Sequence, residues 1–319
     1  MDVSIIIVNW NTREILRDCL ESVYEQAGDV EFEVIVVDNA STDGSVEMIK
    51  RDFEHVVPIE NPHNNGFAAA NNQGIAVAKG RYVLLLNSDT VVLDGAIAKT
   101  VRFADANPQA GVIGCRVLNP DRTLQLTCFM FPSILNMFLS STYLYKLFPK
   151  SRFFGRERMT WWDSSDVRQV DVVKGCFMLV RREAIEQAGV MDERFFMYAE
   201  ETDWCYRFRK DGWEVMFTPV GEIIHLSKGS SRQVESKMRL QLSGSILLFF
   251  RIHRGWVRYA LACLGTAFFF LVRVPYWLAK GIISRKTRNL SWGVVRTYVL
   301  GFVLSFAGWR GLSINREGQ

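Results

Sequence analysis

The apolar residues in the first third of the chain form short unbroken runs that alternate with segments of helical spacing. Unbroken β-branched or aliphatic runs of this kind are typical of strands buried on both faces. Such strands are predicted over residues 3–8, 32–37 and 82–86. Apolar positions three and four residues apart predict helices between and after these strands. The predicted helices cover residues 15–24, 45–53, 67–78 and 95–106.

This alternation predicts an α/β protein with a mostly parallel sheet flanked by helices, because right-handed crossovers join parallel strands. Ligands of such sheets bind beyond the carboxyl ends of the strands. Each of the three predicted strands is followed there by polar residues, which are Asn9 and Asn11, Asp38 and Asn39, and Asn87 and Asp89. Asn11 and Glu14 also have the spacing of a capping box, so Asn11 is expected to cap the first helix.

The pattern becomes less regular after residue 118. Residues 122–166 are rich in aromatic side chains and are predicted to form a loop region over the sheet, helical around residues 133–147. Regular spacing then returns. Strands are predicted over residues 170–180, 214–219 and 222–225, and helices over residues 182–187 and 200–210.

Composition limits the class of protein. The chain has 319 residues, of which 49% are hydrophobic and 23% charged, enough for one large or two small folded domains. Its six cysteines are scattered and form no CxxC pair, which argues against a zinc ribbon or a disulfide framework and suits a reducing compartment. Residues 1–9 contain an acid and only a short apolar run, so they are expected to form a core strand and not a signal peptide.

Charge divides the chain into two parts. Residues 226–319 contain 15 Lys and Arg against two acids, Glu235 and Glu317, whereas residues 1–225 contain 23 Lys and Arg against 32 acids. A split of this size is informative about binding partners and says little about the fold.

The basic part also contains long apolar runs flanked by Trp and Tyr, a combination that suits an anionic lipid surface. Residues 259–272 are almost wholly apolar before Arg273 intervenes, and residues 293–309 contain only one charge. We therefore expect an in-plane or hairpin-like membrane segment, with a spanning helix over residues 259–283 as the alternative. A soluble helical cap would not explain the charge, and the long aliphatic runs argue against nucleic acid.

Three carboxylates begin the helix predicted over residues 200–210, namely Glu200, Glu201 and Asp203. A helix N-terminus favours negative charge, so helix stabilisation alone is one interpretation. A catalytic role is the other. The preceding residues 195–198 are bulky and apolar, and a partly buried carboxylate beside another has a raised pKa, which suits a general base.

Other residues suit the binding of a metal and a phosphate. Asp89 with Asn87 could hold a divalent cation, although Asn-Ser-Asp is also an ordinary turn sequence. His225 precedes a Gly/Ser loop that could approach phosphates, although a single His is more often structural. Asn65 and Gly66 precede a helix whose N-terminus can face an anion. The P-loop, dinucleotide-binding and nucleophile-elbow motifs are absent from the sequence.

Seven segments together resemble the inverting family 2 glycosyltransferases, particularly the bacterial rhamnosyltransferase-like branch. They occur in the family's order over residues 2–231. The segments are VSIIIVNWNTREILRDCLESV, VIVVDNASTDGS, NPHNNGFAAANNQGI, YVLLLNSDT, VKGCFMLVRREAI, FFMYAEETDWCYRFRKDGW and IIHLSKGSS. The resemblance implies a GT-A glycosyltransferase domain over residues 1–231. The charge and apolar runs described above predict a basic, hydrophobic, helical membrane-associating region over residues 232–319.

The resemblance also implies roles for individual residues. Asn9 and Asp38 would hold the base and ribose of a nucleotide-diphospho-sugar, with Asn65, Gly66 and Asn87 completing the donor site. Asn87 stands where the family's DxD motif has its first Asp.

Asp89 and His225 would hold a divalent cation, Mg²⁺ or Mn²⁺. Glu201 would be the base, and it departs from the family pattern because Asp is usual there. Glu200 and Asp203 would orient the acceptor or the start of the helix.

The implied reaction is an inverting, metal-assisted direct displacement. It would move a sugar, with rhamnose as a candidate, to a polyprenyl-diphosphate-linked acceptor in cell-surface polysaccharide assembly. The implied location is the cytoplasmic face of a bacterial inner membrane, with no role for nucleic acid.

Two other functions remain open at the level of sequence. A nucleotidyltransferase would need a glycine-rich basic loop after the first strand, where this chain has NWNTRE. A non-catalytic nucleotide-sugar-binding or scaffold protein of a glycan assembly complex would share the binding residues and lack the transfer.

Overall fold

The computed structural model describes residues 1–226, 235–284 and 287–307, and it divides into two compact units. The first unit comprises Met1–Phe131, Arg158–Phe196 and Glu200–Ser230. The second comprises Pro132–Glu157, Met197–Ala199 and Ser231–Gln319. The expected domain boundary after residue 231, the Gly/Ser residues 227–231 and the terminal Trp309 lie outside the described residues.

A nine-stranded sheet forms the centre of the first unit, counted over the described residues, in the order β3-β2-β1-β4-β10-β6-β11-β5 with β8 beside β11. The strands are β1 (Val3–Asn9), β2 (Phe32–Asp38), β3 (Val56–Glu60), β4 (Tyr82–Asn87), β5 (Thr90–Leu93), β6 (Ala110–Leu118), β8 (Arg168–Gln169), β10 (Phe177–Arg181) and β11 (Glu214–His225). A separate pair joins β7 (Cys128–Phe129) to β9 (Val172–Val173).

Strands β3, β2, β1 and β4 are all parallel, and they end together. In this register Asn9 lies opposite Asp38, and Val8 lies opposite Asn87. The last residues of three strands therefore share one edge of the sheet, as the sequence predicted. Beyond β4 the sheet becomes mixed, because β10 and β5 run antiparallel to their neighbours.

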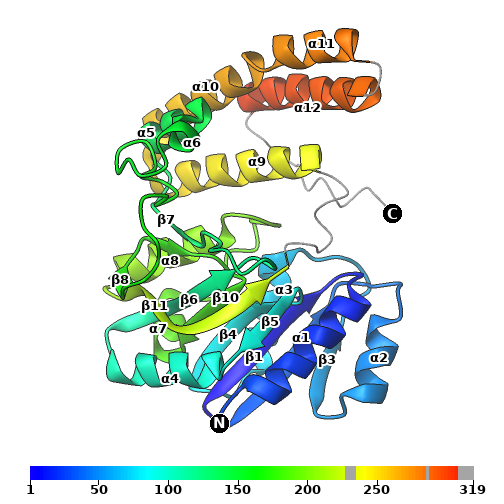
Figure 1. Ribbon diagram of the computed structural model, residues 1–319, viewed down its shortest axis with the longest axis vertical. Helices are drawn as coiled ribbons and strands as arrows, with labels where there is room; N and C mark the ends of the chain where they lie inside the picture. The colour runs from blue at the N-terminus through cyan, green and yellow to red at the C-terminus, as the bar shows by residue number, and fades with distance from the viewer. Residues whose placement is uncertain (227–234, 285–286, 308–319) are drawn as a thin grey trace. The chain divides into compact units, whose positions relative to one another are not determined.

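Helices cover both faces of this sheet (Figure 1). One face packs against α1 (Arg13–Gln26), α2 (Ser45–Asp52) and α4 (Ala96–Ala106). The other packs against α3 (Phe67–Val77), α7 (Arg182–Ala188) and α8 (Glu200–Lys210). The inner strands need apolar residues on both faces for this reason, and β1 alternates Ile5 and Ile7 toward one helical layer with Ile6 toward the other. The predicted fold class, α/β with a mostly parallel sheet flanked by helices, is confirmed.

Four local predictions differ from the structure. The capping box is wrong, because Thr12 precedes α1 and the side chain of Asn11 accepts a hydrogen bond from the backbone of Thr42. Strand β3 was not predicted, since Pro58 interrupts its pattern, and a proline is tolerated there because the strand lies at the sheet edge. The strand predicted over residues 170–180 is divided into β9 and β10. The two short strands predicted over residues 214–225 are one irregular strand, β11.

The second unit is helical in its described residues. Its helices are α5 (Ile134–Thr142), α6 (Leu144–Leu147), α9 (Glu235–His253), α10 (Gly255–Leu271), α11 (Val274–Ile283) and α12 (Arg288–Ala307). The helical prediction around residues 133–147 is confirmed, and Ser133 caps α5 by accepting a hydrogen bond from the Asn136 amide at 3.1 Å.

Two stretches of the second unit are long and apolar enough to cross a membrane by length and composition. Gly255–Ile283 has a mean hydropathy of 1.6 over 29 residues, and Arg288–Ala307 has 1.4 over 20 residues. These apolar C-terminal helices are consistent with membrane association.

The short segment Met197–Ala199 also belongs to the second unit. The carbonyl of Met197 accepts a hydrogen bond from the Ser245 hydroxyl of α9 at 2.9 Å. The next two residues, Tyr198 and Ala199, both have left-handed backbone conformations, with φ of 69° and 63°. Non-glycine residues rarely adopt this conformation, so the segment directly before Glu200 is strained.

Candidate active site

Asn9 and Asp38 pair with each other at the carboxyl edge of the sheet. The amide Nδ2 of Asn9 donates to Asp38 Oδ2 at 2.7 Å, and the backbone N–H of Ser41 donates to Asp38 Oδ1 at 2.7 Å. Thr12 holds the opposite side of the Asn9 amide by donating to its Oδ1 at 2.6 Å. Asn9 and Asp38, the two residues predicted to bind the nucleotide, are both buried. Their hydrogen bonds fix the loop that follows β2.

Asp89 and His225 meet at the same edge. The β4–β5 turn carries Asp89, and β11 ends at His225, which pairs with Thr90. Nε2 of His225 lies 3.0 Å from Asp89 Oδ1 and 3.3 Å from Asn87 Nδ2. Residues far apart in sequence are therefore brought together by the antiparallel pairing of β11 with β5.

Gln125 sets the orientation of the His225 ring. Its Oε1 lies 2.6 Å from Nδ1 of His225, and its Nε2 donates to the Asn119 side chain at 2.9 Å. The amide oxygen of Gln125 therefore faces the ring, and Nδ1 carries the proton that is donated to it. On the other side of the ring, Nε2 faces the carboxylate of Asp89. An imidazole nitrogen and a carboxylate oxygen that converge in this way could hold a divalent cation.

The described residues contain no group of three His, Cys, Asp or Glu side chains arranged to hold a metal. Asp89 and His225 would supply two ligands to a divalent cation at this edge, a carboxylate oxygen and an imidazole nitrogen. A cation bound between protein and a diphosphate fits such an arrangement, because phosphate oxygens and water complete the shell.

Gly66, in the turn before α3, packs against Phe196, which lies shortly before Glu200 and Glu201 in the chain. Its φ is +85°, and a Cβ at this position would lie 2.4 Å from the carbonyl oxygen of Phe196. That same carbonyl accepts a hydrogen bond from the Phe67 amide at 2.8 Å, while Asn39 donates to the carbonyl of Gly66 at 3.2 Å. Only glycine allows this close approach. Asn65, beside it, is half-buried.

Glu200 and Glu201 begin α8 with unusual side-chain environments. The Oε2 atoms of both are buried and have no hydrogen-bond partner among the described residues. Burial raises the pKa of Glu200 well above its ordinary value of 4.5, and the Glu201 carboxylate adds to this effect. Burial also raises the pKa of Glu201, against smaller opposing effects of a backbone hydrogen bond and of Lys174. A carboxylate with a raised pKa and an unpaired oxygen can accept a proton.

Cys176 gives an electrostatic link between the two halves of the candidate site. Burial raises the pKa of its thiol, Lys174 opposes this, and the charges of Asp89 and Glu201 both add to the increase. The backbone carbonyl of Cys176 also accepts a hydrogen bond from the backbone N–H of Asn87 at 3.2 Å. Asp89 and Glu201 therefore both lie within electrostatic range of one buried thiol at the start of β10.

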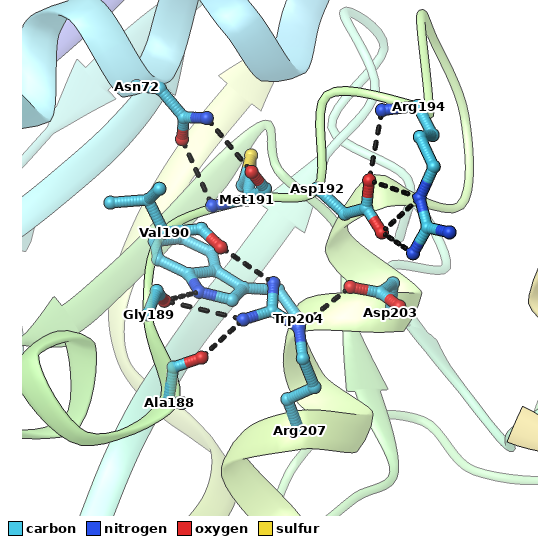
Figure 2. Close-up of polar contacts among 10 residues, drawn as sticks. All are labelled: Asn72, Ala188, Gly189, Val190, Met191, Asp192, Arg194, Asp203, Trp204 and Arg207. Carbon is cyan, nitrogen blue, oxygen red and sulfur yellow. Dashed lines mark hydrogen bonds and ion pairs between the residues drawn. The ribbon is translucent and has the colours of Figure 1, made fainter. Parts of the chain in front are cut away.

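Asp203 lies in a separate network that anchors α8 (Figure 2). Its carboxylate accepts a hydrogen bond from Arg207 Nε at 2.8 Å, and the guanidinium also donates to the carbonyls of Ala188 and Val190. Trp204 donates to the carbonyl of Gly189 at 2.8 Å. Of the two roles predicted for Asp203, these contacts favour fixing the start of the helix.

Sequence reasoning missed Gln125, Thr12, Ser41 and Lys174. Thr12 and Ser41 lie in segments that were singled out, and only their neighbours were assigned roles. Gln125 lies 100 positions from the histidine that it orients, in the irregular segment after β6, and no local pattern marks it.

The family of the chain is decided by its sequence profile. The profile described as "Glycosyl transferase family 2" matches residues 4–188, which is more than half of the chain. The chain belongs to glycosyl transferase family 2. It is therefore an enzyme of the hexosyltransferase class, and the predicted family is confirmed.

Two curated relatives support this family 2 assignment. The chain is 27% identical over 237 residues to the N-acetylglucosaminyl-diphospho-decaprenol L-rhamnosyltransferase of Mycobacterium tuberculosis, covering 70% of this chain and 76% of the relative. It is 26% identical over 245 residues to the low-salt glycan biosynthesis hexosyltransferase Agl10 of Haloferax volcanii, covering 76% of this chain and 72% of the relative.

The fold of this family 2 glycosyltransferase also resembles a solved structure. The mannosyltransferase PcManGT from Pyrobaculum calidifontis, in complex with GDP-Man and Mn²⁺, superposes with a TM-score of 0.57. The match covers 95% of this chain and 86% of the mannosyltransferase at 16% identity. At that identity the likeness concerns the fold alone.

Proposed function

We propose that this enzyme transfers a sugar from a nucleotide-diphospho-sugar to a lipid-linked glycan acceptor, with inversion at the anomeric carbon and with Glu201 as the base. The observation that carries the proposal is the buried Oε2 of Glu201, which has no hydrogen-bond partner in the described part of the chain and lies in electrostatic range of the same thiol as Asp89. This arrangement supports a proton acceptor on one side of a site whose other side suits the diphosphate.

The donor would bind at the carboxyl edge of β1, β2 and β4. The buried Asn9–Asp38 pair shapes the loop after β2, where we place the base and ribose. Asn65 and Gly66 would present the turn before α3 and its helix N-terminus to the diphosphate. Asn87 would complete this edge beside Asp89.

Asp89 and His225 fit a divalent cation, Mg²⁺ or Mn²⁺, because a carboxylate oxygen and an imidazole nitrogen converge while Gln125 contacts the other ring nitrogen. When bound, such a cation would neutralise the charge that grows on the departing nucleoside diphosphate. The Mn²⁺ in the mannosyltransferase complex is consistent with this assignment.

The chemical step follows from the position of Glu201. Its carboxylate takes the proton from the acceptor hydroxyl as that oxygen bonds to the anomeric carbon. The bond from this carbon to the diphosphate oxygen breaks on the opposite face, so a single displacement inverts the carbon. Glu200 lies beside Glu201 at the start of α8, and burial together with the Glu201 charge raises the pKa of the Glu200 carboxyl.

The acceptor would be a glycan on a polyprenyl diphosphate, with rhamnose as a candidate for the sugar transferred. The mycobacterial relative is named for a decaprenol-linked acceptor and for L-rhamnose. The two apolar helical stretches of the second unit and the excess of Lys and Arg after residue 226 support work at an anionic membrane surface. We place the enzyme on the cytoplasmic face, where nucleotide sugars are available.

The Glu201→Gln variant tests this proposal. The amide keeps the shape of the side chain and cannot accept the proton, so kcat is expected to fall by about 10³-fold. The dissociation constant for the nucleotide sugar is expected to change less than about twofold, since the base contributes to the chemical step and not to donor binding. The matched control is Glu183→Gln on the exposed part of α7, which should leave both values unchanged.

The measurement is transfer of labelled sugar to extracted lipid acceptor, with donor binding followed by thermal shift in Mg²⁺ or Mn²⁺. Full activity of Glu201→Gln would contradict its role as base. Label that stays only in water-soluble products would contradict the lipid acceptor. A parent protein that binds donor and transfers no sugar to any acceptor would support the non-catalytic alternative.

A further inference from the structure

The segment Pro132–Glu157 lies within the second unit although it is inserted between strands of the first unit's sheet. Its helix α5 packs against α10, the first of the long apolar C-terminal helices. The sequence predicted this segment as a loop over the sheet. Its actual neighbours give it a different environment from that of a substrate-covering loop.

Arg273 joins the inserted segment to the C-terminal helices. It lies between α10 and α11, inside a stretch long enough to cross a membrane. Its guanidinium donates to the carbonyl of Ser141 at 2.5 Å and of Phe269 at 2.9 Å, and its Cζ lies 3.7 Å from the centre of the Phe269 ring.

Ser141 lies in the last turn of α5, where backbone carbonyls lack helical partners and the helix dipole favours a cation. A charge inside an apolar helical stretch needs such compensation in a low-dielectric environment, where water does not supply it. The contact between Arg273 and Ser141 therefore fits a low-dielectric environment for the end of α5, as for α10 and α11.

The inserted segment also exposes large apolar side chains. Leu147 is 73% exposed and Phe138 is 60% exposed. Phe148 and Phe153 are exposed as well, and both pack against the ring of Phe154, at 5.4 Å between ring centres. Exposed apolar side chains gathered in this way mark an interaction surface.

The charge of the segment selects the partner. Residues 132–157 contain four basic residues, Lys146, Lys150, Arg152 and Arg156, and one acid, Glu157. Three of the basic side chains are exposed beside the exposed apolar ones. Basic residues interleaved with exposed Phe and Leu match the interface of an anionic bilayer, in which rings and aliphatic chains enter the acyl boundary and cations remain among the phosphates.

We infer that the inserted segment, Pro132–Glu157, is a second membrane-contacting element, which enters an anionic lipid surface through Phe138, Leu147, Phe148 and Phe153. This inference rests on the proposed membrane association of the C-terminal helices and extends it to the middle of the chain. The enzyme would thus contact the membrane through parts of the sequence that lie on both sides of β11.

A single fluorescent label tests the inference. All six native cysteines are buried, so a Leu147→Cys variant of the full chain can be labelled selectively with an environment-sensitive NBD dye. The matched control is Val77→Cys, an exposed apolar position at the end of α3. The labelled proteins are mixed with anionic vesicles of roughly 30% phosphatidylglycerol in phosphatidylcholine.

We expect a blue shift and an increase of about threefold or more in emission at position 147, with quenching by doxyl-labelled lipid, and no change at position 77. Flotation of both labelled proteins with the vesicles shows whether the C-terminal helices bind. If the proteins float with the vesicles but the emission at position 147 does not change, the inference about the inserted segment is wrong and the proposed membrane association of the C-terminal helices stands. Failure of both proteins to float would overturn the proposed membrane association as well.

A second variant measures the energetic contribution. Replacing Leu147 and Phe148 by Ser is expected to lower the vesicle partition coefficient by about tenfold or more, since two large apolar side chains would no longer leave water. The control pair is Val77→Ser with Val190→Ser, both exposed in the first unit, which should leave partitioning unchanged. Unchanged partitioning of the Leu147/Phe148 variant would contradict the inference.

Discussion

The two units of the molecule handle polar and apolar groups in opposite ways. The first unit buries its aliphatic strands under two helical layers and also buries polar side chains, including Asn9, Asp38 and Glu200, near one edge of its sheet. Among its described residues the second unit has an apolar cluster around Phe270, and it leaves large apolar side chains exposed along its helices, such as Phe268. The exposed apolar side chains of the second unit are consistent with membrane association.

The largest predicted contrast concerns apolar side chains. Leu84→Ala in β4 removes a fully buried side chain, so the first unit should lose about 3–4 kcal/mol of unfolding free energy. Phe268→Ala removes a side chain that is 61% exposed, and the loss should stay below about 0.5 kcal/mol.

Amide hydrogen exchange in mild detergent measures this contrast for peptides of each unit. Exchange in β4 should accelerate by about 100-fold or more in Leu84→Ala. A loss as large in Phe268→Ala would mean that its exposed face is a core surface and not a lipid-facing one.

The second contrast compares two glycines with left-handed backbones. Gly66→Ala in the first unit adds a Cβ only 2.4 Å from the Phe196 carbonyl, and is expected to cost about 2–3 kcal/mol. Gly255→Ala at the start of α10 also has positive φ, but its Cβ would meet no described atom within 4 Å apart from its immediate chain neighbours, so only the strain of about 1 kcal/mol applies. Thermal melts in detergent compare the two variants with the parent. Equal shifts would indicate that the close approach to Phe196 is not maintained in solution.

The third and smallest effect is the pH dependence of stability. The native pKa of Glu200 is raised above its ordinary value of 4.5, so the native state holds a proton that the unfolded state releases. The stability from this group is fully present below pH 4.5 and is lost as the pH rises through the native pKa. Glu200→Gln should therefore flatten the decline of Tm between pH 5 and pH 8 by a few degrees.

Differential scanning fluorimetry at several pH values measures this change, with Glu186→Gln on the exposed part of α7 as the control. A parent and a Glu200→Gln variant with parallel pH profiles would show that Glu200 titrates normally in the folded protein.

The sheet was predictable because its signals are local. A buried strand such as β1 needs an apolar residue at nearly every position, and the polar residues that end β1, β2 and β4 follow from the common direction of parallel strands. Strand β3 was not predictable in this way, since an edge strand needs fewer buried positions and tolerates Pro58.

The site was predictable only in part. Asp89 and His225 could be nominated from their types, but their 3.0 Å approach depends on the pairing of β11 with β5, which no local pattern encodes. Gln125 acts through a tertiary contact from an irregular segment and carries no sequence signal. The assignment of Pro132–Glu157 to the second unit was not predicted either. The spacing of apolar residues indicates that one face of a helix is buried, but it does not identify the element that packs against that face.

The strained pair Tyr198 and Ala199 has a practical consequence. These two residues connect Met197 to Glu200, and the carbonyl of Met197 accepts a hydrogen bond from Ser245 of α9. A soluble fragment cut before α9 would delete that donor and let two unfavourable backbone conformations relax, each by about 1–3 kcal/mol. Truncation before α9 would therefore also change the backbone that positions Glu201, the proposed base, at the start of α8.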